Sequence, residues 1–434
     1  MGQKIVIAVL TILFYITSLL GGNTNTTDNN SLRSYTPSSQ QEKQLSSIIG
    51  QTALVLGDKV TVRSGPGTDY LAISSVNKGL EVTLLEAKNE WYKVRFAPGQ
   101  DGWIAGYLLN VIPNYGHTGK SDSSKVILGY YLLNNQSYES MLENSDVLTA
   151  IAPWSWALDS YGGLHAEFDE ETFGKTLLFA GNKGLETYAL IHNLQNGYFD
   201  SQTASNLLNS PIGQERAINN IYQTLLDWGV KGINIDLENV PAQDRQLLTD
   251  FVRKLAEKLR TANLTTTIAV PAKTADDPYN DFSGAYDYQA LGQYVDYMVI
   301  MAYDQHYSKG DPGPVSSIEW VDKVIDFALS QTSSDKIVLG IPGYGYNWSK
   351  TGGTGVTYQQ AMELAAEEGV SVKWHSQYKV PYFHYGNGNE VWFENRYSTK
   401  YKLDLVKKHD LAGIALWRLG QEDPGIWDTI SKTF

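Results

Sequence analysis

From residue 124 onward, segments typical of β-strands alternate with segments that have the apolar spacing of α-helices. The strongest helical pattern spans residues 242–262, where Leu247, Leu248, Phe251, Val252, Leu255 and Leu259 recur at helical intervals. Eight segments have the composition of strands: 126–131, 147–153, 188–192, 232–237, 265–270, 296–303, 336–342 and 412–417. Eight strand and helix units in about 310 residues predict an α/β fold of the (β/α)8 (TIM) barrel type, with reactive groups at the C-terminal strand ends.

A doubly wound open sheet is the competing fold. Its dinucleotide-binding form would have Gly-x-Gly-x-x-Gly after the first strand, and the chain has no such motif there. The longest gap lies between the seventh and eighth strand candidates. Within it, residues 382–385 and 390–393 flank Gly386-Asn387-Gly388-Asn389, which predicts a hairpin. We therefore expect a small α+β insertion between strands 7 and 8, beside the top of the barrel.

Short strand candidates separated by turn residues occupy the region before the barrel. Between residues 53 and 112 they include 59–63, 81–85, 91–96 and 102–104. Several short strands at this spacing predict a small all-β barrel. The segments Val62-Arg-Ser-Gly-Pro-Gly-Thr68 and Gly102-Trp-Ile104 resemble the bacterial Src-homology-3-like domain, which we assign to residues 48–113. The resemblance implies binding of cell-wall peptides, and a simple spacer is the alternative.

The chain begins with the layout of an export signal. A lysine at position 4 precedes an uncharged apolar stretch, residues 5–20. Residues 1–22 are expected to be a signal peptide or a membrane anchor, since no clear cleavage site separates the two. Residues 23–47 are rich in Asn, Thr, Ser and Gln, which predicts a disordered linker. The barrel domain is expected over residues 124–434, in a protein that is secreted or held at the cell surface.

Composition excludes several classes of function. The chain has 434 residues with 34 Lys and Arg against 47 Asp and Glu, a net charge of −13, and no basic run, so we expect no nucleic-acid partner. It has no cysteine, which excludes disulfides and thiolate chemistry. The seven histidines form no His-Glu-x-x-His, and no phosphate-binding Gly-x-x-x-x-Gly-Lys occurs. We expect no metal and no cofactor, and we expect a monomer.

Polar and apolar residues alternate strictly from Gly232 to Glu238. In a strand, side chains two residues apart lie on one face at roughly 6.6 Å. Asn234, Asp236 and Glu238 therefore form one column, which ends at a strand tip. Buried unpaired carboxylates are energetically costly, so a buried column indicates a functional site. Together with aromatic residues at other strand ends, it favours acid/base cleavage of a polysaccharide.

Glycosidic bonds are usually cleaved by two carboxylates that flank the bond, but Asp236 and Glu238 lie on the same side of one strand. A mechanism in which the substrate supplies the nucleophile avoids this difficulty. The segment Gly232-x-Asn234-x-Asp236-x-Glu238 resembles the Asp-Gly-x-Asp-x-Asp-x-Glu signature of glycoside hydrolase family 18. Three further strand ends are similar to that family's motifs: Gly129-Tyr-Tyr131, Met301-Ala-Tyr-Asp304 and Gly413 to Trp417.

Two other segments, Val391-Trp-Phe-Glu394 and Leu416-Trp-Arg-Leu-Gly-Gln-Glu-Asp-Pro424, are similar to a bacterial branch with spore-cortex and cell-wall N-acetylglucosaminidases. The resemblance implies retaining catalysis assisted by the substrate's 2-acetamido group. It implies the following roles: Glu238 as acid/base, Asp236 as partner of the acetamide, Tyr303 as donor to the acetamide oxygen, Trp417 as floor of the sugar site, and Tyr130 and Asp304 as supports.

The chain departs from the family pattern at Lys231, which stands in place of the signature's first Asp and faces away from the column, and at two further places. Asn234 stands where a carboxylate would share a proton with Asp236, so the like-charge effect on the Asp236 pKa is missing. At the third strand, the family's Ser-x-Gly-Gly is replaced by Ile191-His-Asn193, and we expect Asn193 to face the substrate. Trp154, after the second strand, is a candidate sugar platform, with packing as the alternative.

The sequence thus predicts an extracellular hydrolase of β-1,4 bonds in polymers of N-acetylglucosamine. Peptidoglycan is the first choice of substrate because of the exported small barrel. Chitin or chitooligosaccharides are the second choice, since aromatic stacking suits both polymers. A sugar-binding wall protein without catalysis is a further alternative, although the retained Glu238 argues against it.

Overall fold

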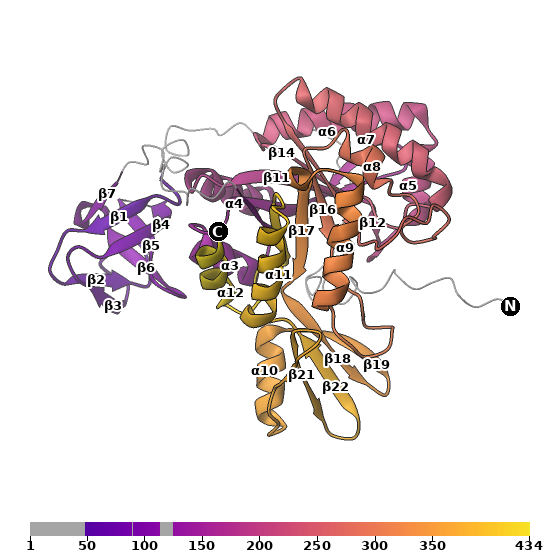
Figure 1. The fold of residues 1–434 in the computed structure, drawn as a ribbon. Helices are drawn as coiled ribbons and strands as arrows, with labels where there is room; N and C mark the ends of the chain where they lie inside the picture. Colours follow the sequence, from indigo (N-terminus) through magenta and orange to yellow (C-terminus); the bar gives the residue numbers. More distant parts are fainter. Residues whose placement is uncertain (1–47, 89, 113–124) are drawn as a thin grey trace.

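The computed structural model of the protein describes residues 48–88, 90–112 and 125–434 and contains a small β-domain followed by a larger barrel (Figure 1). The predicted signal or anchor, residues 1–22, and the predicted linker, residues 23–47, lie outside the described residues. Within the described part of the chain, no helix has the length and apolar content needed to cross a membrane.

The small domain is a seven-stranded antiparallel sheet in the order β3-β2-β6-β5-β4-β1-β7. Its elements are β1 (Thr52–Val55), β2 (Val60–Arg63), β3 (Ala72–Val76), β4 (Glu81–Lys88), β5 (Trp91–Ala97), β6 (Gln100–Ala105), the 3-10 turn η1 (Gly106–Leu108) and β7 (Leu109–Val111). Alternating apolar residues such as Val60, Val62 and Val94 fill its core. The predicted small all-β barrel is confirmed.

The larger domain is built on eight parallel strands. These are β8 (Val126–Tyr131), β9 (Ala150–Leu158), β11 (Glu186–His192), β14 (Gly232–Asp236), β15 (Thr265–Pro271), β16 (Tyr297–Met301), β17 (Ile337–Pro342) and β23 (Gly413–Trp417). The first strand, β8, pairs with both β9 and β23, so the sheet is closed. The prediction of a (β/α)8 barrel is confirmed, and the open doubly wound sheet is excluded.

Most strands match the predicted ranges, but the second one is shifted. The sequence predicted residues 147–153, whereas β9 runs from Ala150 to Leu158. It continues beyond the barrel because its last residues pair with the short antiparallel strand β10 (Leu164–Ala166). Within this extension Trp154 packs in the interior cluster and Trp156 in the cluster between strands and helices, as alternation along a strand requires.

Helices cover the outside of the barrel and connect its strands. They are α3 (Asn135–Asn144), α4 (Glu170–Asn182), α5 (Ser201–Leu208), α6 (Pro211–Trp228), α7 (Arg245–Arg260), α8 (Tyr288–Gly292), α9 (Ile318–Gln331), α11 (Arg396–Lys408) and α12 (Ile426–Thr433). The 3-10 turns η2 (Ala242–Asp244) and η3 (Ser334–Lys336) and a hairpin of β12 (Leu194–Gln195) and β13 (Tyr198–Phe199) complete the domain. The helix predicted at 242–262 corresponds to η2 and α7, in which Leu248, Leu255 and Leu259 are buried.

The insertion between β17 and β23 is a five-stranded antiparallel sheet covered by one helix (Figure 1). It contains β18 (Tyr344–Ser349), β19 (Gly352–Thr357), α10 (Tyr358–Glu367), β20 (Lys373–His375), β21 (Val380–Tyr385) and β22 (Asn389–Phe393). The apolar residues of α10 pack on one face of the sheet. Aromatic residues of the other face pack with Tyr303 and Trp417 of the barrel, so the insertion lies beside the strand ends as predicted.

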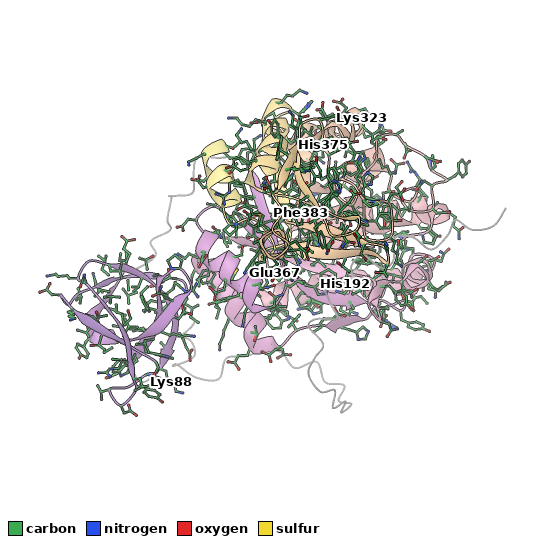
Figure 2. All side chains as sticks on the ribbon, turned by 90° about the horizontal axis from the view of Figure 1, so that it is seen from below. Lys88, His192, Lys323, Glu367, His375 and Phe383 are labelled. Atoms are coloured by element: carbon green, nitrogen blue, oxygen red, sulfur yellow. The ribbon has the colours of Figure 1, made fainter. Side chains whose placement is uncertain are left out.

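One buried arginine joins the small domain to the barrel. Arg95, on β5, contacts Glu139 on α3 at 2.5 Å and lies 3.6 Å from Glu143. Burial alone would lower the pKa of Arg95, but hydrogen bonds to Asp101 and Glu139 outweigh it and raise that pKa. Ile49 adds an apolar contact, since it belongs to the core of the larger domain. The two domains, marked by Lys88 and His192 in Figure 2, therefore contact each other through polar and apolar side chains.

Candidate active site

The polar column of the fourth strand points into the barrel. Ile233, Ile235 and Leu237 pack in the outer cluster with the helices, whereas Asn234 and Asp236 are buried on the inner face. Strand β14 ends at Asp236, so Glu238 stands two residues beyond it, at the C-terminal mouth of the barrel. The predicted alternation is present, and its carboxylates lie where barrel enzymes carry their reactive groups.

Asn234 forms the base of the column. Its Nδ2 donates to Oγ1 of Thr267 on β15 at 2.7 Å, and its Oδ1 accepts from the hydroxyl of Tyr130 on β8 at 3.2 Å. Thr267 in turn donates to the carbonyl of Ile233 at 2.9 Å. The amide therefore has partners on both sides, and it joins three strands of the barrel as an uncharged support beneath Asp236.

The two carboxyl groups above Asn234 retain protons more strongly than free carboxylates. Burial raises the pKa of Asp236 to about 7. Burial, followed by the negative charges of Asp236 and Asp304, raises the pKa of Glu238 well above its usual range. An ionised Asp236 makes ionisation of Glu238 less favourable, so the pair favours states in which one member keeps its proton.

Asp304 connects this pair to the insertion. It accepts hydrogen bonds from the hydroxyls of Tyr344 at 2.6 Å and Tyr346 at 2.9 Å, both on β18. Burial raises the pKa of Asp304 to about 6, although the two tyrosine hydrogen bonds lower it. The sequence analysis missed these tyrosines. The sequence pattern that could have identified them is Tyr344-Gly-Tyr346, directly after the seventh strand. In a strand, this alternation puts both tyrosine side chains on one face.

Aromatic side chains gather around the mouth of the barrel. Tyr130 meets Trp417 edge to face, with ring centroids 5.3 Å apart, and Trp154 meets Trp417 at 6.1 Å. Tyr303 lies two residues beyond the end of β16, with its ring 6.3 Å from that of Tyr344. Burial, followed by the charges of Tyr130, Asp236, Glu238 and Asp304, raises the pKa of Tyr303, so its hydroxyl stays a hydrogen-bond donor.

Trp154 is held by two residues that the sequence analysis did not assign. Its indole Nε1 donates to Oε2 of Glu167 at 2.9 Å, and its ring stacks on His192 with centroids 4.3 Å apart. The backbone N–H of Leu194 donates to Nδ1 of His192 at 3.1 Å, which leaves Nε2 directed at Glu167, 3.2 Å away. Burial lowers the pKa of His192 despite the glutamate, so the imidazole is neutral.

The structure shows what the side chain of Asn193 contacts. It is completely buried. Nδ2 donates to the carbonyls of Asp200 and Glu238, at 3.0 and 2.9 Å, and Oδ1 accepts from the N–H of Glu238 at 2.9 Å. Both N–H groups of the amide and one hydrogen bond to its oxygen are directed at the backbone, so Asn193 supports Glu238.

One cluster of potential metal ligands occurs within the described residues. It consists of Asp322, Asp326 and His409, on the outer helix α9 and at the end of α11. The ammonium of Lys408 lies 3.3 Å from Asp322, and His409 lies equally close to it. Asp322 is thus paired with two basic side chains on the outside of the barrel, apart from the column.

Comparison with known proteins agrees with this geometry. The model of glycosyl hydrolases family 18 matches residues 195–422, which is more than half of the chain, and that of the bacterial SH3 domain matches residues 58–110. The chain belongs to glycoside hydrolase family 18. The first three barrel strands precede the matched range, and the closed sheet adds them to the family-18 domain.

Several relatives of this family-18 chain are known by sequence. The putative sporulation-specific glycosylase YdhD of Bacillus subtilis is 32% identical over 312 residues, which cover 69% of this chain and 73% of that protein. The cortical fragment-lytic enzyme of Bacillus subtilis is 33% identical over 255 residues, covering 56% of this chain and 59% of the relative.

Solved structures give two further similarities. The spore cortex-lytic enzyme SleL of Bacillus megaterium has 28% identity and a TM-score of 0.66, covering 78% of this chain and 79% of its own. A chitinase from Chromobacterium violaceum also has 28% identity, with a TM-score of 0.68, and the match covers 71% of this chain and 98% of the chitinase. The similar proteins therefore include some named for lysis of the spore cortex and one named a chitinase.

Proposed function

We propose that this family-18 glycosidase cleaves β-1,4 bonds of N-acetylglucosamine-containing polymers outside the cell, with peptidoglycan as its substrate. The observation that carries the proposal is the buried pair at the end of β14, where Glu238 holds its proton beside Asp236, whose pKa is about 7. Asp236 ends the strand and Glu238 lies two residues further along the chain, an arrangement that favours the mechanism in which the substrate's acetamide is the nucleophile.

Each group then has a distinct task. Glu238 donates its proton to the glycosidic oxygen and later activates water. Asp236 orients the 2-acetamido group and stabilises the positive oxazolinium, and the Tyr303 hydroxyl donates to the acetamide oxygen. Trp417 forms the floor of the sugar site. Edge-to-face contacts with the rings of Tyr130 and Trp154 hold its indole ring in place. Asp304 and Asn234 support the pair from beside and below.

The choice of peptidoglycan rests on two observations. The sequence relatives include cortical fragment-lytic enzymes, and a bacterial SH3 domain precedes the barrel. Chitin is the second candidate, favoured by the match that covers 98% of the Chromobacterium chitinase. Digesting purified peptidoglycan and chitin with the full chain, and identifying new reducing ends by mass spectrometry, tests both. N-acetylglucosamine ends from peptidoglycan support the proposal, cleavage of chitin alone supports the second candidate, and muramic acid ends contradict the assigned bond.

The small domain is proposed to bind wall peptides. Its edge strand β3 and the turn before it expose Tyr70, Leu71 and Ile73, of which Leu71 is 77% exposed. The contact through Arg95 lies elsewhere, on β5, and leaves this edge uncovered by the barrel. Binding of the full chain to sacculi before and after amidase removal of the stem peptides is the test. Equal binding to both forms would favour the spacer alternative.

The pH dependence of the reaction provides a further prediction for Asn234→Asp. The Tyr130 hydroxyl already donates to position 234, so it would stabilise a carboxylate there. That negative charge raises the pKa of Asp236 above about 7, so the ionised Asp236 that the mechanism needs appears only at higher pH. We expect the acidic limb of the kcat/KM profile to move to higher pH.

Profiles of kcat/KM against pH for wild type, Asn234→Asp and Asn234→Leu measure this effect. The leucine variant is the control, because it removes the hydrogen bonds without adding charge. An acidic limb that stays in place in the aspartate variant, or moves equally in both variants, would contradict an electrostatic role for position 234.

A further inference from the structure

The backbone that carries Glu238 is not held by the barrel sheet. The ladder between β11 and β14 ends with the pair His192 and Asp236, and the ladder between β14 and β15 ends with Ile235 and Ile268. Residues 237–239 therefore extend past the last strand pairing on both sides. A residue in this place needs other hydrogen bonds to keep a fixed backbone direction.

Asn193 supplies those hydrogen bonds from the side of β11. It directly follows His192, the last paired residue, and its amide binds both the N–H and the carbonyl of Glu238, each at 2.9 Å. In a parallel ladder such as that of β11 and β14, the neighbouring strand offers a carbonyl and an N–H, from two different residues, to these two groups. The Asn193 side chain thus takes the place of these two backbone groups at the acid/base.

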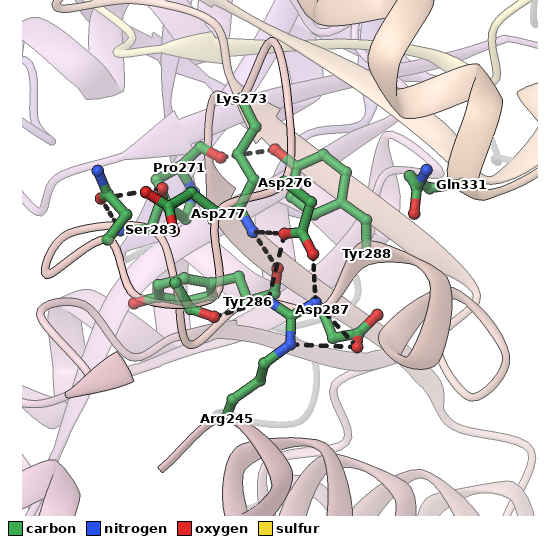
Figure 3. Close-up of polar contacts among 12 residues, drawn as sticks. Arg245, Pro271, Lys273, Asp276, Asp277, Ser283, Tyr286, Asp287, Tyr288 and Gln331 are labelled. Atoms are coloured by element: carbon green, nitrogen blue, oxygen red, sulfur yellow. Dashed lines mark hydrogen bonds and ion pairs between the residues drawn. The ribbon is translucent and has the colours of Figure 1, made fainter. Parts of the chain in front are cut away.

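Tyr286 holds the same segment from the side of β15. Its hydroxyl donates to the carbonyl of Leu237 at 2.7 Å, and its own carbonyl accepts from Nζ of Lys273 at 2.6 Å. Figure 3 shows Tyr286 within a network in which Arg245 pairs with Asp276 and Asp287, at 2.8 and 2.9 Å. This network fixes the loop between β15 and α8, and with it the position of the tyrosine.

We propose that Asn193 and Tyr286 are positioning residues for Glu238, a proposal that rests on Glu238 being the proton donor of the proposed function. The two side chains fix the peptide units on both sides of the Glu238 Cα, so that only its side-chain torsions remain free. Displacing a reacting group by about 1 Å can reduce a rate roughly 100-fold. The two residues touch no reacting atom and act through the backbone of Glu238.

Substitution at each position, with one matched control, tests the proposal. We expect Asn193→Ala to lower kcat about 100-fold and Tyr286→Phe about 10-fold, with KM changed less than about twofold, because acid placement and not sugar binding is altered. Tyr288→Phe is the control: its hydroxyl likewise donates to the carbonyl at a strand end, Pro271, but it does not contact residues 237–239. It should keep the wild-type kcat.

A second readout separates positioning from general loosening of the fold. An aryl glycoside has a leaving group that needs little protonation, whereas a sugar leaving group depends on the acid. Asn193→Ala and Tyr286→Phe should therefore slow cleavage of the natural glycan much more than cleavage of an aryl β-glycoside of N-acetylglucosamine. Equal losses on both substrates, or a loss in Tyr288→Phe as large as in Tyr286→Phe, would overturn the proposal.

The experiment also distinguishes this proposal from the function on which it rests. If Glu238→Gln is as active as wild type, the proposed function fails. If Glu238→Gln is inactive but Tyr286→Phe behaves as wild type, the positioning proposal alone fails. If Asn193→Ala does not fold, the comparison of Tyr286→Phe with Tyr288→Phe tests the positioning proposal. Each of these variants loses a single oxygen atom and keeps its ring.

Discussion

Replacing Glu238 by glutamine should reduce hydrolysis of the glycan about 10³-fold or more while the protein stays folded. General acid/base catalysis contributes about 10²- to 10⁴-fold, and Glu238 is proposed to serve both steps of a retaining reaction. Glutamine has nearly the same shape but no proton to donate. Because Glu238 is held through its backbone, the substitution should leave the segment in place. Release of reducing ends by wild type and variant measures the effect.

The matched control is Glu363→Gln, on the exposed surface of α10, which should keep wild-type activity. Affinity for chitooligosaccharides, measured by calorimetry, should be similar in wild type and Glu238→Gln, because sugar binding depends on the aromatic residues. Wild-type protein that binds these oligosaccharides but releases no reducing ends would favour the sugar-binding alternative. Glu238→Gln with wild-type activity would remove Glu238 from the mechanism.

The parts of the fold that could be predicted are those in which local pattern and tertiary environment agree. The alternation from Gly232 to Glu238 required a strand with a polar column, and the structure has that strand, ending two residues earlier. Strand and helix alternation gave the barrel, and the turn sequence Gly386-Asn-Gly-Asn389 gave the hairpin of β21 and β22. In each case, residues close in sequence determine the geometry.

The missed features depend on contacts between distant segments. Asn193 lies 45 residues from Glu238, and the Tyr344 hydroxyl lies 40 residues from Asp304. Local periodicity does not show that the Asn193 amide will hydrogen-bond to the backbone of Glu238. Nor does it show that the hydroxyl of Tyr344, from the insertion, will reach the carboxylate of Asp304. For Asn193, the sequence analysis inferred a substrate-facing side chain from its position at a strand end. At the end of β11 that side chain turns instead to the neighbouring backbone.

The second large effect is expected for Lys402→Met, which should lower the free energy of unfolding by about 3–5 kcal/mol, the usual cost of leaving a buried charge without its partner. Nζ of Lys402, on α11, binds Oε2 of Glu394 at 2.8 Å, and both side chains are 2% exposed. Urea unfolding of wild type and variant at pH 8 measures the loss. Lys400→Met is the control, because the Lys400–Asp404 pair on the same helix is exposed and should contribute little.

The loss in Lys402→Met should also depend on pH with a definite sign. Burial already raises the pKa of Glu394, and without the lysine that pKa rises further. The folded variant then binds its proton more tightly than the unfolded chain, whose glutamate has a pKa of about 4.3. The deficit relative to wild type should therefore be large at pH 8 and smaller at pH 5. A deficit independent of pH, or equal to that of Lys400→Met, would show that the pair contributes no buried charge interaction.

We expect Lys402→Met to affect the candidate active site as well as the stability of the fold. Glu394 directly follows β22 of the insertion, and Lys402 lies on a helix of the barrel. The pair ties the insertion to the barrel, and the insertion carries Tyr344 and Tyr346, which hold Asp304. The double variant Lys402→Met with Glu394→Leu replaces both charges by apolar groups and should recover most of the stability. If stability returns but kcat does not, the charged pair serves to orient the insertion; if both return, apolar packing at this junction is sufficient to keep the insertion tyrosines on Asp304.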